Sequence, residues 1–168
     1  MKTPVLRLSL FVLGLIAVFS AAGCNSPSKK HDYTTEAARF FIEANEEEAF
    51  ATAVLPISGV RVAVNNKPFI TELDIVHVDL STSDMGNYLV FQLTPWASRD
   101  LYRFTGDNQG KRVIVAINGV ALGARQIDRP FNGGYIAIFV EMPDDQLPTL
   151  IKNLNATCVD IQKEIAKK

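Results

Sequence analysis

The chain has 168 residues, of which 48% are hydrophobic and 21% charged, a balance typical of a folded protein with one core. Its formal net charge is only −1 at pH 7, so charge predicts no affinity for nucleic acid or for an anionic lipid surface. The two cysteines and two histidines are too few for a disulfide framework or for the usual spacing of zinc ligands. Composition therefore argues against those classes and favours a single globular domain.

The first residues have the pattern of an export signal. Lys2 and Arg7 precede an uncharged apolar run over residues 8–22, which is too short to span a bilayer comfortably. Small residues then lead directly to Cys24, and this stretch resembles the lipobox of bacterial lipoproteins. The resemblance implies that residues 1–23 are removed and that acylated Cys24 anchors the mature protein in a lipid bilayer.

Three parts of the chain follow from this interpretation. Residues 1–23 are the lipoprotein signal peptide, residues 24–33 are the lipidated cysteine and a flexible polar tether, and residues 34–168 are one domain. Asn25 follows the cysteine, where an aspartate would resemble the inner-membrane retention signal of some bacteria. We therefore expect a lipid-anchored envelope protein that faces the periplasm, with the outer membrane favoured over the inner.

The first half of the domain is predicted to be mainly β-structure. Residues 34–53 leave helix and strand open, because helix formers and acidic residues surround a β-prone core. Residues 53–64 place two short β-prone runs around a Pro/Ser/Gly turn and predict a hairpin or bend. Apolar residues alternate over 74–80 and again over 87–94, which predicts two further strands joined by a turn.

A helix is predicted next, with Thr94 as its N-cap and Pro95 in its first turn. Gly110 lies just beyond the helical pattern, where glycine readily ends a helix, and a strand follows over 111–117. A phosphate-binding loop requires the opposite order, a strand and then a helix, so we predict no nucleotide site here. The predicted buried stripe of the helix consists of Ala97, Leu101, Phe104 and Thr105.

Asn118 and Gly119 separate two β-prone runs and are the strongest hairpin signal in the chain. One more strand is predicted over 135–142, and a closing helix follows the acidic pair Asp144 and Asp145. These elements predict an α+β fold of the ferredoxin-like kind, an antiparallel sheet with two main helices packed on one face. The apolar stripe predicted for the closing helix consists of Leu147, Leu150, Ile151, Leu154, Cys158, Ile161 and Ile165.

The succession of sequences over 68–81, 89–127 and 129–140 is similar to the head of the first large periplasmic domain of SecD, a membrane subunit that assists protein export. The resemblance spans about residues 68–156 and implies the same α+β fold. It also implies that residues 38–44 form a strand, and that the domain contacts extended or unfolded chains.

Three departures from the SecD pattern limit what the resemblance implies. The chain has no transmembrane helices after its signal, so the proton-driven motor function of SecD is not carried over. Asn118 stands where the family usually has an acidic residue, and Arg125 stands where a proline is common. Only the fold and the contact with extended chains are therefore expected.

No set of residues has the pattern of a catalytic or metal site. His31 lies in the tether, and His77 alternates with valines and shares the outer face of a strand with Asp79. The adjacent acids at 46–48 and 144–145 are typical of solvated faces and helix starts. Cys158 lies on an apolar helical stripe and is predicted to be buried and inert. We predict no enzyme, no cofactor and no metal.

Trp96 and Phe131 are the candidate contacts with a partner protein, with partial burial at the rim of the core as the alternative. The first functional hypothesis is a non-catalytic module that binds a folded envelope protein or an exported chain, through an exposed sheet edge. The alternative is a structural or assembly component of an envelope complex.

Overall fold

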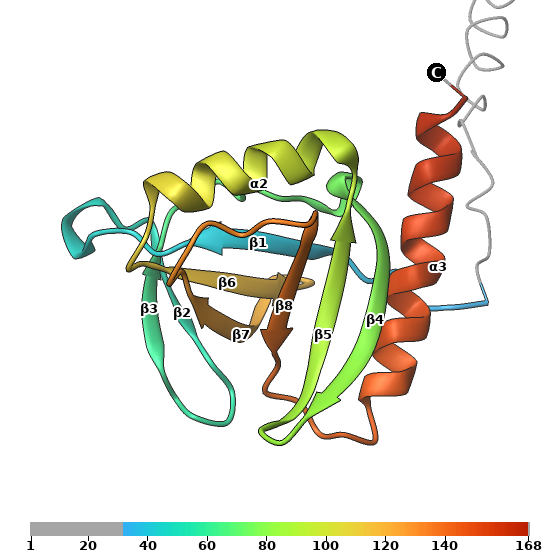
Figure 1. The fold of residues 1–168 in the computed structure, drawn as a ribbon. Helices are drawn as coiled ribbons and strands as arrows, with labels where there is room; N and C mark the ends of the chain where they lie inside the picture. Colours follow the sequence, from blue (N-terminus) through green and yellow to red (C-terminus); the bar gives the residue numbers. More distant parts are fainter. Residues whose placement is uncertain (1–31, 168) are drawn as a thin grey trace, which may run out of the picture. The chain divides into compact units, whose positions relative to one another are not determined.

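A computed structural model describes residues 32–167, and the chain from Tyr33 onward forms one compact unit. The predicted signal peptide, Cys24, His31 and most of the tether lie outside the described residues. The strands form three antiparallel sheets (Figure 1). In the order of pairing, these are β1 (Ala38–Ile42), β6 (Arg112–Ile117) and β7 (Val120–Gln126); β2 (Ala51–Val54) and β3 (Arg61–Val64); and β4 (Ile75–Ser83), β5 (Gly86–Leu93) and β8 (Tyr135–Phe139).

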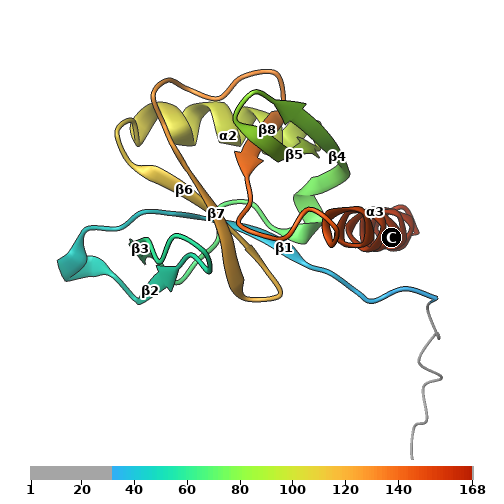
Figure 2. The ribbon, with the colours of Figure 1, turned by 90° about the horizontal axis from the view of Figure 1, so that it is seen from below.

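The β1–β6–β7 sheet is buried on both faces. Side chains alternate along a strand, so Phe40 enters the main core while its neighbour Phe41 packs against a second, smaller apolar cluster. In β6, Val113 belongs to the main core and Ile114 to the second cluster. Figure 2 shows the cause, because α2 (Pro95–Asp107) lies on one side of this sheet and β2–β3 on the other.

Local sequence signals determine the hairpins and the start of α2. Asn118 and Gly119 have φ values of 50° and 83°, which confirms the predicted turn between β6 and β7. The Thr94 hydroxyl accepts a hydrogen bond from the Ala97 amide at 3.3 Å, so the predicted N-cap is also confirmed. The structure also confirms the strand at 38–42, the hairpin within 53–64 and the helix-then-strand order around Gly110.

The closing helix α3 (Leu147–Ile165) packs beside β4. Its predicted apolar stripe is buried from Leu147 to Cys158, but Ile165 is 47% exposed, because the last turn extends past the core. Burial of the Cys158 thiol raises its pKa to about 11, as expected for an inert thiol. None of the helices in the described part of the chain is long and apolar enough to cross a membrane.

The α+β class is confirmed, but the strands are divided among three sheets where a single sheet was expected. Gly123 of β7 approaches the β8 end so closely that a Cβ atom there would lie 2.1 Å from the carbonyl oxygen of Phe139. The Glu141 amide, just after β8, donates to the Leu122 carbonyl oxygen at 2.6 Å. The two strands therefore cross in contact without pairing along their length, which separates the sheets.

Candidate functional site

Trp96 is the most accessible candidate contact. It is 75% exposed, because it lies one residue off the buried stripe of α2. The Arg99 guanidinium carbon lies 4.1 Å from the centre of the Trp96 ring, a cation–π arrangement that holds the two side chains together at the surface. Of the two alternatives for Trp96, exposure and partial burial at the rim of the core, the structure shows exposure, and contact with a partner stays a prediction.

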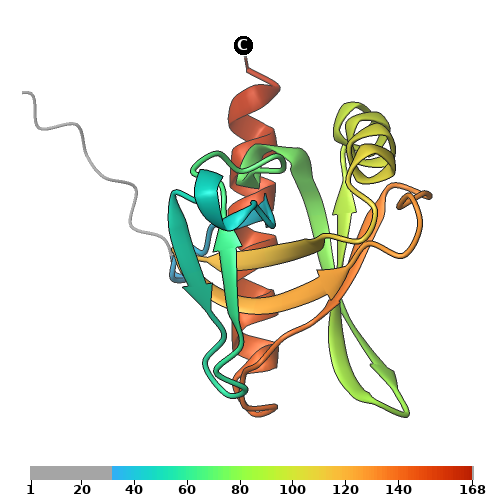
Figure 3. The same cartoon turned by 90° about the vertical axis from the view of Figure 1, so that its left-hand side faces the viewer.

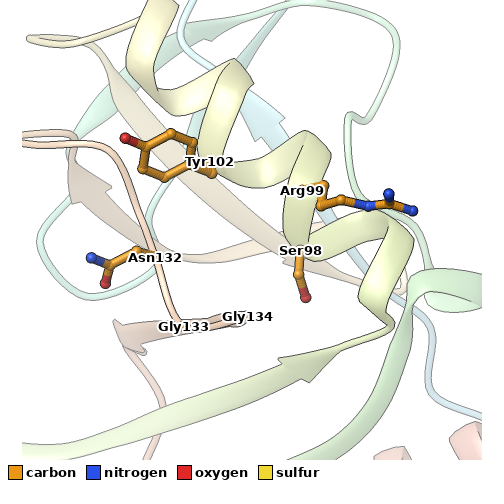
Figure 4. Close-up of a pocket in the computed structure, with 6 residues that line it drawn as sticks. All are labelled: Ser98, Arg99, Tyr102, Asn132, Gly133 and Gly134. Atoms are coloured by element: carbon orange, nitrogen blue, oxygen red, sulfur yellow. The ribbon is translucent and has the colours of Figure 1, made fainter.

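A shallow pocket of about 450 Å³ adjoins this helix face (Figure 4). The Ser98 hydroxyl donates to the Thr94 carbonyl oxygen at 2.8 Å, and Arg99 extends away from Tyr102. Gly134, with φ of 76°, approaches Ser98 so closely that a Cβ atom would lie 2.7 Å from the hydroxyl oxygen. None of the residues that line this pocket is a base that could activate the Ser98 hydroxyl. The lining residues are Ser98, Arg99, Tyr102, Asn132, Gly133 and Gly134.

Phe131 is buried, which agrees with the alternative of burial at the core and not with an accessible contact. Its side chain is only 6% exposed and belongs to the main core. The Phe131 amide donates to the buried Thr105 hydroxyl at 2.9 Å, and the Arg125 guanidinium carbon lies 4.6 Å from the ring centre. These contacts draw a turn-rich segment into the core, so Phe131 is not a partner contact in this structure.

A larger hollow of about 570 Å³ lies between β2 and the β6–β7 hairpin, and we call it the β2 groove. All four residues of β2 line the groove, so the strand presents its edge to it and not one of its faces. The floor comes from the second face of the β1–β6–β7 sheet. Figure 3 shows β2 and β3, in teal, standing apart from β4 and β5, with β6 and β7 running across between them. The floor residues are Phe41, Ile114, Ala116 and Ala121, and the exposed Gly119 and Val120 of the hairpin lie at the rim.

The peptide groups of Thr52 and Val54 form the open edge of β2. The Ala63 carbonyl oxygen, opposite Thr52, accepts from the Ala44 amide on the far side of β3 at 2.9 Å. Thr52 and Ala63 are therefore a non-hydrogen-bonded pair, and the N–H and C=O groups of Thr52 and Val54 point away from β3. Within the described residues β2 pairs with β3 alone, so these groups have no strand partner.

The rim of the β2 groove is apolar and accessible. Phe50 is 74% exposed, Val54 is 47% exposed and Val120 is 56% exposed. A strand with a free edge is a template for another strand, and exposed apolar side chains beside it add a hydrophobic contribution. The groove can therefore take an extended polypeptide segment by backbone pairing.

Two carboxylates hold the groove walls in place. Glu141 accepts hydrogen bonds from the Ile57 and Ser58 amides at 2.8 and 2.9 Å, which fixes the turn between β2 and β3. Glu43, just after β1, accepts from the backbone and side chain of Arg112 at 2.9 Å. The Arg112 hydrogen bond lowers the pKa of Glu43, although partial burial opposes the shift.

The candidate metal ligands and titratable groups lie apart in the described residues. No group of three or more His, Cys, Asp or Glu residues within them could hold a metal ion. His77 pairs with Asp79 at 3.1 Å on an exposed strand face, as the sequence predicted. Cys158 is a buried free thiol on α3.

Comparison with known proteins identifies the fold. No protein-family model and no curated protein matches the sequence. The structure is similar to a chain solved under the description "Structure and function of a membrane component SecDF that enhances protein export", with a TM-score of 0.57 and 15% identity. That match covers 73% of this chain and 63% of the other. A SecDF chain in a super-membrane-facing form gives a TM-score of 0.58 and 16% identity, covering 71% of this chain and 18% of the other.

The domain is SecD-like in fold. This agrees with the resemblance drawn from the sequence. Two of the departures noted there, Asn118 and Arg125, form hydrogen bonds in this SecD-like domain. The Asn118 side-chain oxygen accepts from the Ala37 amide at 2.9 Å and ties the segment before β1 to the hairpin. Arg125 donates to the Ala137 carbonyl oxygen at 2.7 Å.

Sequence reasoning did not find the β2 groove. The only signal was the continuous apolar run over 113–117, which is typical of a strand buried on both faces. That run indicates that another part of the chain packs on the second face of this strand, but it does not indicate that part of this face stays accessible. The partial cover depends on where β2 and β3 pack, which is a long-range property.

Proposed function

We propose that this chain is a non-catalytic envelope lipoprotein that binds extended polypeptide segments in the β2 groove. The observation that carries the proposal is the open edge of β2 above an apolar floor. Backbone pairing at such an edge places little demand on sequence, which suits a module that meets many different chains. Acylation of Cys24 anchors the domain to the membrane, with the outer membrane favoured and the domain in the periplasm.

A link to protein export supports the choice of extended chains as partners. The similar SecDF protein is described as a membrane component that enhances protein export. This chain spans 63% of that structure and 18% of the other SecDF chain, so only the fold and a binding role enter the proposal. In this role, the domain binds an exported chain before that chain folds.

A role in assembling an envelope complex is the second candidate. It is favoured by Trp96, which is 75% exposed and stacked with Arg99 on α2, outside the β2 groove. Tryptophan and arginine are the residues most enriched at the energetic centres of protein interfaces. The two functions use different surfaces and are therefore separable by mutation.

Photocrosslinking in cells tests the two functions together. A photoreactive amino acid replaces Val54 or Val120 in the groove in one set of strains, and Trp96 in another. We expect many different exported proteins to crosslink from the groove positions. If Trp96 alone yields adducts, and always with the same one or two envelope proteins, the assembly role replaces the binding of extended chains.

Binding is then measured with the full chain in phosphatidylcholine nanodiscs, with empty nanodiscs as the control. Fluorescently labelled unfolded segments of unrelated sequence are titrated, and anisotropy is recorded. Saturable binding is expected for several of them, and it weakens when Val120→Asp places a charge on the groove rim. Absence of saturation up to millimolar concentration overturns the proposal.

The anchor has its own test. Cells are fed an alkyne analogue of palmitate, and incorporation is compared between the wild-type chain and Cys24→Ser. Label in the wild type alone is the expected result. Equal label in both chains, or none in either, contradicts acylation at Cys24.

A further inference from the structure

The β2 groove is apolar on one side and open to solvent on the other. Its floor includes Ile114 and Ala121, and Ala53 of β2 packs against the same cluster, whereas the alternating residues Thr52 and Val54 are exposed. In an extended segment, successive side chains point to opposite sides. A segment paired with β2 therefore directs every second side chain at the floor and the others at water.

The direction of the bound segment follows from the pairing in the rest of the domain. Every strand pair in the described residues is antiparallel, and antiparallel pairs are slightly more stable per residue than parallel ones. An antiparallel segment places its C-terminal end beside the start of β2, next to the short helix η1 (Glu46–Glu48). Its N-terminal end lies beside Val54.

The two ends of the β2 edge differ in charge. Glu47 and Glu48 are exposed at the start of β2, and neither makes an ion pair with any described residue. Lys67 is exposed one residue after Asn66, which lines the groove at the same end, so these two carboxylates outnumber this lysine. At the other end the exposed Arg61, opposite Val54, and the Glu141 carboxylate on the β2–β3 turn carry opposite charges.

We propose that the β2 groove prefers extended segments in which apolar and polar residues alternate and lysine or arginine follows at the C-terminal end. This inference rests on the proposed function, because it names the class of segment that the same groove binds. Alternation matches the single apolar floor, and the basic residue matches Glu47 and Glu48. A uniformly apolar segment leaves half of its apolar side chains in water, so it gains less binding free energy for each apolar residue.

Four labelled peptides of equal length and composition test the preference in phosphatidylcholine nanodiscs. One alternates valine with threonine and ends in two lysines, and the second carries the lysines at its N-terminal end. The third and fourth group the valines in one block, with the lysines at either end. We expect the first peptide to bind about two- to tenfold more tightly than the second, the range given by one or two exposed ion pairs.

The double variant E47Q/E48Q identifies the cause of the preference. It is expected to bind the first two peptides equally, whereas D144N/D145N, which loses the same charge outside the groove, keeps the difference. Equal binding of all four peptides to the wild type overturns the inference and leaves the proposed function standing. Binding of none of them overturns the proposed function itself. A preference that survives in E47Q/E48Q also overturns the inference.

Discussion

The strand edges on the two sides of the domain differ in how their backbone groups are satisfied. On β4, the Val78 amide donates to the side-chain oxygen of Asn155 in α3 at 2.8 Å, and the Asn155 amide donates back to the Val78 carbonyl oxygen at 2.8 Å. On β8, Arg125 donates to the Ala137 carbonyl oxygen. On β2, the outward groups of Thr52 have no such partner among the described residues. Native proteins generally protect their strand edges, so the open edge of β2 is the one that we associate with binding.

Breaking the contact that separates the sheets has the largest expected effect. Gly123→Ala places a Cβ atom 2.1 Å from the Phe139 carbonyl oxygen, which requires backbone movement at the β7–β8 crossing. We expect a loss of about 3 kcal/mol in the free energy of unfolding, measured with urea. Gly106→Ala is the matched control, because Gly106 lies in α2 and an added Cβ atom would be 3.7 Å from the Pro130 side chain. This substitution is expected to be neutral or stabilising. Equal losses in both variants would contradict the close approach.

Opening the β4 edge is expected to have the next largest effect. Asn155→Leu removes both side-chain hydrogen bonds to Val78 and leaves a second strand edge unpaired. Because the site is partly buried, we expect a loss of about 2 kcal/mol in urea unfolding. We also expect concentration-dependent self-association in light scattering, as for any exposed edge. Unchanged stability would show that α3 covers β4 by apolar packing alone.

How far the sequence predicts this arrangement depends on whether a feature is local. Thr94 with Pro95, and Asn118 with Gly119, determine a cap and a turn through neighbouring atoms, so these predictions are confirmed. The crossing at Gly123 joins strands formed at different places in the chain, and no local signal encodes it. The three-sheet division was missed for that reason.

The candidate site was predicted only in part for a similar reason. Exposure of Trp96 follows from its position off the helical stripe, which is a local property. Phe131 lies in a segment of turn formers, which left exposure and burial of its ring open, and a long-range hydrogen bond from its amide to the Thr105 hydroxyl accompanies burial. The β2 groove forms because the β2–β3 hairpin packs on the second face of the β1–β6–β7 sheet. Composition and hydrophobic periodicity do not predict this long-range packing.

Removal of the ion pair between Glu43, after β1, and Arg112 of β6 is expected to have a smaller, pH-dependent effect on the free energy of unfolding. The Arg112 hydrogen bond lowers the pKa of Glu43 in the folded state, so the ionised carboxylate stabilises the fold above its unfolded pKa. That contribution is lost as pH falls through the lowered folded-state pKa. We expect Glu43→Gln to cost about 1 kcal/mol at pH 7, and the difference from wild type to disappear in acid. Urea unfolding at both pH values tests this, and a difference that is constant with pH contradicts it.

The smallest expected change in stability is at the edge itself. Thr52→Pro removes an N–H group that points away from β3, so no hydrogen bond within the β2–β3 pair is lost. We expect a change of less than about 0.5 kcal/mol in urea unfolding. Ala53→Pro is the matched control, because Ala53 and Val62 form a hydrogen-bonded pair, and it should cost about 2 kcal/mol.

The same pair of variants separates the edge from the apolar rim in binding. A segment paired with β2 needs the outward N–H of Thr52, whereas contact with Val54 and Val120 alone does not. We therefore expect Thr52→Pro to weaken binding of extended segments about tenfold while the domain stays folded. If Thr52→Pro binds as tightly as the wild type, the groove acts through its apolar rim and not through strand addition. The open edge of β2 would then be a feature of the fold without a part in recognition.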